Sequence, residues 1–163
     1  MDKQIEYIFK GDDSMTTPQE LIDSTIIKVE AALKDKFPDH VKFDEGSYTI
    51  ERGSTQVMIQ VRPFTDKETC VECFAHVVIG ARVDAELMQF LLRKNAELHI
   101  GGFGLLFDDT IVFQHSIAGT NLDANELVTS VNTVAVIADY YDDEIVERSG
   151  GKRATDIVMD LED

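Results

Sequence analysis

Apolar residues recur at helical spacing in three stretches of the chain. The first stretch follows Thr17-Pro18-Gln19-Glu20, a pattern that predicts a capping box with proline in the first turn. This helix should end before Pro38, because the residue before a proline disfavours the α conformation. A second helix is expected at about residues 85–95, with Asp84 as its N-cap. A third, long helix should begin at the capping box Asp123-Ala124-Asn125-Glu126, and its apolar stripe comprises Leu127, Val131, Val134, Ala138, Tyr141 and Ile145.

Between the helices, apolar and polar residues alternate with a period of two, which predicts strands. The expected strands begin near Tyr48 and then cover about residues 56–62, 70–79, 97–107 and 110–117. The strand at 56–62 should end at Pro63 or lie at a sheet edge, because proline has no N–H to donate to a neighbouring strand. The first three strands follow one another closely, so an antiparallel meander is the simplest pairing.

The predicted order of elements is α-β-β-β-α-β-β-α. Runs of strands separated by single helices indicate an α+β fold, with the helices packed on one face of an antiparallel sheet. The predicted organisation is an N-terminal arm at residues 1–16, a single domain at 17–148, and a flexible acidic tail at 149–163.

The second helix is apolar over more than half of its circumference, which is too broad for a helix with one solvated face. Its apolar residues are Leu87, Met88, Phe90, Leu91 and Leu92. We therefore expect this helix either to be enclosed within the fold or to be covered by a second copy of the chain. If the strand at 56–62 is an edge, Met58 would be accessible to a visiting peptide strand.

Composition narrows the classes of partner. The formal net charge is −16, which argues against nucleic acid and against anionic membrane surfaces as partners. The chain has two cysteines, no apolar segment long enough to span a membrane, and acidic residues near Met1. These features predict a protein of a reducing compartment, and we expect it in the cytoplasm.

None of the candidate chemical motifs is complete. Cys70 and Cys73 have C-x-x-C spacing but fall in a predicted strand, so we interpret them as small apolar residues, with a weak redox or metal role as the alternative. Three histidines, His76, His99 and His115, lack metal-ligand spacing and could bind a metal only if the fold brings them together. The sequence therefore predicts no cofactor, no metal and no catalytic residue.

A glycine-rich segment at residues 101–104 and a cluster of acids in the long predicted helix are two further candidate sites. Gly101-Gly102-Phe103-Gly104 fails the dinucleotide-binding pattern, but it could mark a strand bulge above a small-molecule pocket. Acids cluster in the second half of the long helix, where we expect a solvated face, with a site for a basic partner or a divalent cation as alternatives. They are Asp139, Asp142, Asp143, Glu144 and Glu147.

The second half of the chain resembles the YbjN-like family, small bacterial proteins described as putative sensory-transduction regulators. The resemblance covers roughly residues 85–147 and rests on short segments: Leu91-Leu92-Arg93-Lys94-Asn95-Ala96-Glu97-Leu98, Gly101-Gly102-Phe103-Gly104-Leu105, Ile111-Val112-Phe113, Leu122-Asp123 and Tyr140-Tyr141-Asp142-Asp143-Glu144-Ile145. That family is similar in fold to the class I chaperones of type III secretion. The resemblance implies a chaperone-like homodimer and carries no catalytic residues with it.

We therefore expect a non-enzymatic protein-binding module that acts as a homodimer on a protein partner the sequence does not identify. Met58, Leu87, Met88, Phe90 and Leu91 are the candidate partner or dimer contacts. The alternatives are a small-molecule or metal-binding sensor domain and an enzyme with an unrecognised site.

Overall fold

The computed structural model describes residues 16–159. Residues 1–15 and 160–163 lie outside the described part, and with them almost all of the predicted arm. The elements run in the order α2 (Gln19–Lys36), β1 (Val41–Asp44), β2 (Ser47–Arg52), β3 (Thr55–Pro63), β4 (Thr69–Ile79), α3 (Ala85–Glu97), β5 (Gly102–Leu105), β6 (Ile111–Ala118), α4 (Ala124–Ser149), β7 (Lys152–Arg153) and α5 (Ala154–Met159).

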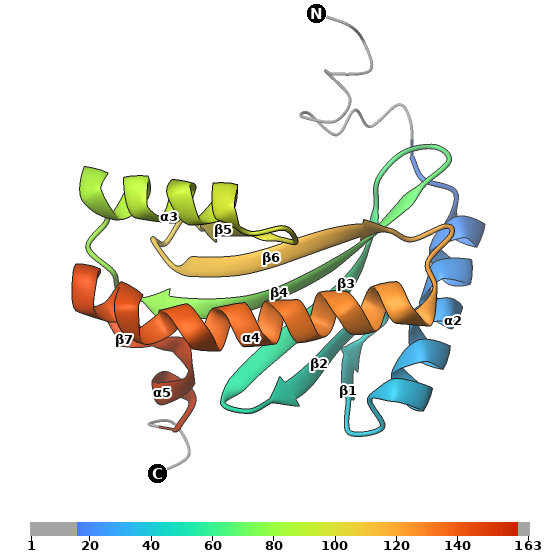
Figure 1. Ribbon diagram of the computed structural model, residues 1–163. Coiled ribbons are helices and arrows are strands. Elements are labelled where there is room, and N and C mark those ends of the chain that lie inside the picture. Colours follow the sequence, from blue (N-terminus) through green and yellow to red (C-terminus); the bar gives the residue numbers. More distant parts are fainter. Residues whose placement is uncertain (1–15, 160–163) are drawn as a thin grey trace, which may run out of the picture.

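The strands form one antiparallel sheet in the order β1-β2-β3-β4-β6-β5, with β7 paired to one end of β4. This confirms the predicted meander of three consecutive strands, which are β2, β3 and β4. Helices α2, α3 and α4 lie on one side of the sheet, and the long α4 crosses the strands (Figure 1). The fold is therefore the predicted α+β architecture. We call the sheet surface opposite these three helices the open face.

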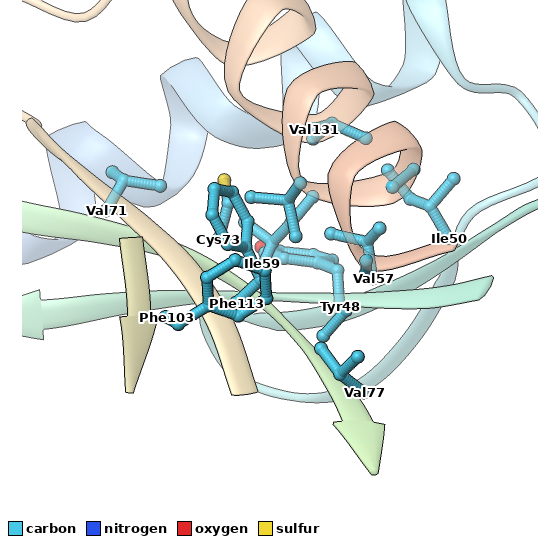
Figure 2. Packing of buried hydrophobic residues seen from close by; sticks show 14 of the residues in the cluster. Tyr48, Ile50, Val57, Ile59, Val71, Cys73, Val77, Phe103, Phe113 and Val131 are labelled. Atoms are coloured by element: carbon cyan, nitrogen blue, oxygen red, sulfur yellow. The ribbon is translucent and has the colours of Figure 1, made fainter. Parts of the chain in front are cut away.

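The core fills the space between the helices and the sheet (Figure 2). Alternation along β4 turns Val71, Cys73, Ala75 and Val77 toward the helices, and all four are buried. The predicted stripe of α4 meets them there, with Val131 fully buried. Burying each large aliphatic side chain of this kind stabilises the fold by about 1.5–3 kcal/mol.

The ends of the helices follow the local sequence at two of three predicted caps. Asp123 and Glu126 form the predicted capping box of α4, and Asp84 accepts a hydrogen bond from the backbone N–H of Leu87. The predicted box at Thr17 is wrong. The Thr17 hydroxyl instead donates to the carbonyl of Thr65 and accepts from the N–H of Phe64, so it attaches the start of α2 to a loop that is distant in the sequence.

Three further departures concern strands and the tail. Strand β1 was not predicted, because its four residues are exposed and give no buried alternation. Strand β3 ends at Pro63 as one alternative required, but it pairs with β2 and β4 and is not an edge. The segment predicted as a flexible tail contains the end of α4, β7 and α5 as far as Met159. The predicted domain boundaries otherwise stay a prediction.

Candidate functional site

The open face has an apolar centre. Met58 of β3 lies directly opposite Phe74 of β4, and both side chains are half-buried. The ring of His76 continues this row, 6.2 Å from the ring of Phe74. Sequence alternation selected Met58, but the reason is different from the predicted one: Met58 is accessible from the face of a central strand, not from an edge.

Some apolar residues of helix α3 are buried within the protomer, and others are exposed to solvent. Leu87 and Leu91 are buried, so neither can contact a partner unless the helix moves. Phe90 is half-buried; its ring forms a T-shaped pair with Tyr141 at 6.4 Å between ring centres, and the Arg148 guanidinium lies 4.1 Å from the centre of the Phe90 ring. The accessible apolar residues of the helix are Met88, with 38% of its surface exposed, and Leu92, with 63%. Leu92 was absent from the predicted contacts, although it belongs to the same apolar set.

The two edges of the sheet differ in the groups that they present to a possible added strand. At the β5 edge, the Asn95 side chain accepts from the Phe103 N–H at 2.6 Å and donates to the Phe103 carbonyl at 3.1 Å. One amide side chain thus occupies the backbone groups that an added strand would use. Strand β1 forms the opposite edge, where Val41 and Phe43 are exposed.

The two cysteines do not form a redox pair. Residues three apart in a strand point to opposite faces, and accordingly Cys73 is buried in the core while Cys70 is half-buried on the open face. Burial raises the pKa of the Cys73 thiol to about 12, and burial together with Glu72 raises the pKa of Cys70. Both thiols are therefore held in the unreactive protonated form at neutral pH.

The structure does not bring the three histidines together. His115 pairs with Cys73 and lies on the helix side of the sheet, whereas His76 lies on the open face and His99 is exposed in the loop before β5. Burial lowers the pKa of both His76 and His115. Within residues 16–159 no group of three or more His, Cys, Asp or Glu side chains is arranged to hold a metal ion.

The glycine segment packs closely against the sheet, and several acids of the cluster in α4 have partners within the same protomer. A Cβ at Gly101 would come within 2.7 Å of the Phe113 ring, so the space beside Gly101 is filled, which counts against the predicted small-molecule pocket there. In the acidic cluster, Asp139 accepts from the Ser54 hydroxyl at 2.6 Å, and Glu144 pairs with Arg148 at 2.7 Å. Asp142 is buried, and burial raises the pKa of its carboxyl.

A cavity of about 320 Å³ opens on the open face between the β2–β3 hairpin, the end of β4 and α5. It is lined by Glu51, Gly53, Ser54, Gln56, Met58, His76, Ile79, Ala154, Thr155 and Ile157. Among these residues, Met58 was a predicted partner contact, and His76 was considered only as a possible metal ligand. The lining residues come from β2, β3, β4, α5 and the β2–β3 turn, and only the tertiary structure brings these segments together.

Comparisons with known proteins agree with this architecture. A family model described as TY-Chap1, the T3SS (YopN, CesT) and YbjN peptide-binding chaperone 1, matches residues 23–157. A chain of the crystal structure of the ExsC–ExsE complex superposes with a TM-score of 0.55 at 14% identity, covering 76% of this chain and 93% of that one. At this identity the likeness shows the fold alone. No significant match was found among curated proteins, and none of the helices within residues 16–159 is long and apolar enough to span a membrane.

Proposed function

Because the chain belongs to the TY-Chap1 family of peptide-binding chaperones, we propose that it is a non-enzymatic, chaperone-like module that binds peptide segments of a cytoplasmic protein partner as a homodimer. The family match over most of the chain carries this proposal. The open face supports it, since Met58 and Phe74 offer an adaptable apolar surface beside polar strand residues.

We assign the dimer contact to the exposed side of α3. Leu92 and Met88 are one helical turn apart and accessible, while Leu87 and Leu91 anchor the same helix inward. Exposed apolar residues grouped on one helix are typical of a surface that another chain covers. A two-fold dimer would place the same residues of both copies against each other.

Light scattering over a dilution series tests the homodimer. We expect a mass of twice the 18.3 kDa protomer, and we expect Leu92→Glu to shift it to the monomer. Gln89→Glu, at a polar position of the same helix that is also exposed, is the matched control and should remain dimeric. A wild-type monomer at every concentration, or a dimer unaffected by Leu92→Glu, would contradict the α3 interface.

Peptide binding is tested separately on an array of 15-residue peptides tiled over an unfolded protein. We expect the wild-type protein to bind a subset of these peptides, and Met58→Gln, which replaces the thioether with a neutral polar amide of similar length, to bind them more weakly. Circular dichroism must first show that this variant is folded, which its half-buried position allows. Absence of binding by the wild-type protein would refute the peptide-binding proposal.

A further inference from the structure

The cavity on the open face exists because β3 and β4 separate. Their antiparallel pairing stops at Met58 and Phe74, and a register shift follows in β4 between His76 and Val78. Beyond that point β4 pairs with β7 through Val78 and Ile79. After β7 the chain continues into α5 (Figure 1). Ala154, Thr155 and Ile157 of α5 line the cavity.

The same register shift gives the cavity an apolar floor. Strict alternation would place Ile79 with Val77 on the helix side, but the shift leaves Val78 buried and turns Ile79 into the cavity. Met58 and Ile157 complete the apolar lining. A volume of about 320 Å³ lies at the small end of ligand pockets, so it suits a single long side chain better than a large cofactor.

Among the described lining residues, Glu51 supplies one carboxylate at the rim of the cavity. The Glu51 carboxylate has no ion pair with any residue between Thr16 and Met159, and no Lys or Arg is found among the described lining residues. The nearby Arg153 is engaged, since its guanidinium holds both carboxylate oxygens of Asp156 at 2.9 Å. Lys152 lies opposite Ile79 in the β4–β7 pairing and is not among the described residues that line the cavity.

We propose that this cavity receives an arginine or lysine side chain of an extended peptide lying on the open face, with the aliphatic stem on Met58, Ile79 and Ile157 and the cation at Glu51. The proposal rests on the proposed peptide-binding function and names a residue class that the bound peptide carries. Long basic side chains place their methylene groups on apolar surface while their charge stays near water, which matches an apolar floor below a carboxylate at the rim. Met58 and His76 belong both to the cavity and to the open face, so a peptide on that face reaches the cavity directly.

Capped single amino acids test the side chain in isolation. The probes are the acetyl amides of arginine, lysine, norleucine and glutamate, followed by NMR of the methionine methyl groups and histidine rings. The protein has five methionines, so Met58→Leu assigns the relevant signal. We expect the arginine and lysine amides to shift the Met58 and His76 signals with dissociation constants in the millimolar range, and the glutamate amide to leave them unchanged.

Glu51→Gln should weaken binding of the arginine amide about two- to fivefold, the loss expected for one solvated ion pair, and should not affect the norleucine amide. Glu20→Gln, on α2, is the control and should bind as the wild-type protein does. Equal shifts with the glutamate amide, no shifts with either basic amide, or an unchanged Glu51→Gln affinity would overturn the proposal. Tighter binding of agmatine than of the arginine amide would indicate a site for a small cation and would contradict the proposal that the cavity binds a peptide side chain.

The peptide array separates this proposal from the broader one. If peptides bind without enrichment in Arg or Lys, and Glu51→Gln binds the same set, the cavity proposal fails while peptide binding stands. If the bound peptides are enriched in Arg or Lys and Glu51→Gln removes that enrichment, both the peptide-binding proposal and the cavity proposal are supported.

Discussion

Removing the Asn95 side chain should expose the β5 edge of the sheet. In the native protein this amide forms two hydrogen bonds with the backbone of Phe103, at 2.6 and 3.1 Å. Asn95→Ala leaves the N–H and carbonyl of Phe103 without these partners. The backbone of an otherwise buried residue would then depend on water, or on a strand from another molecule.

The magnitude follows from two opposing contributions. Each hydrogen bond contributes a net 0.5–1.5 kcal/mol, so the loss of both costs roughly 1–3 kcal/mol. Alanine is better than asparagine inside a helix by about 0.5 kcal/mol, which partly offsets the cost. Asn132→Ala on α4 has the same helix effect at an exposed position, so the difference between the two variants isolates the hydrogen bonds. We expect that difference to be about 2 kcal/mol, or about 4–8 °C in the melting temperature.

Thermal unfolding, amide hydrogen exchange and light scattering should be measured on both variants. In Asn95→Ala the Phe103 amide should exchange faster, and the protein should self-associate more readily than Asn132→Ala. Asn95→Asp sharpens the test, because it keeps the acceptor but places a carboxylate against the Phe103 carbonyl, and it should be no more stable than Asn95→Ala. The reasoning is refuted if Phe103 exchange is unchanged and the two alanine variants melt at the same temperature.

Two further predictions concern stability. Burial raises the pKa of the Asp142 carboxyl, so its ionisation opposes folding; the native state gains from protonated Asp142 at low pH and loses that gain as the pH rises through the raised pKa. Asp142→Asn keeps an acceptor for the Asp143 N–H. It should raise the free energy of unfolding at pH 7 by roughly 0.5–1 kcal/mol and should not raise it near pH 3. Denaturant unfolding at both pH values measures the two effects. A Cβ at Gly119 would overlap the buried hydroxyl of Thr69, so Gly119→Ala should lower the free energy of unfolding by about 2 kcal/mol. A Cβ at Gly102 meets only ordinary van der Waals contacts, so Gly102→Ala should lower it by less than about 1 kcal/mol. Equal melting temperatures for the two alanine variants would show that the loop near Thr69 yields at no cost.

Periodicity was sufficient for the elements that bury one face. The stripe through Val131 and the alternation through Val71 and Cys73 predicted α4 and β4, because each apolar position there is buried against a partner layer. Strand β1 buries none of its residues, although Val41 and Phe43 alternate with polar residues; it pairs with β2, and Lys42 forms an ion pair with Glu30 of α2. Sequence reasoning missed the short strands β1 and β7, which depend on pairing with a neighbouring strand, and the short helix α5, in which Ala154, Thr155, Asp156 and Ile157 are only partly buried.

Residues of the candidate sites were predictable only as members of apolar sets. The sequence by itself determined that α3 carries more apolar surface than one face can bury, and that Met58 is an apolar residue on the polar side of its strand. Tertiary structure decided that Leu87 and Leu91 are buried while Leu92 stays exposed, because β5 and α4 cover only part of the circumference of α3. It also decided the cavity: β3 and β4 diverge, β7 and α5 fill part of the gap, and the remaining space brings Glu51, His76 and Ile157 together. Local sequence sets which side chains prefer burial, whereas the meeting of distant segments depends on how whole strands separate and pair.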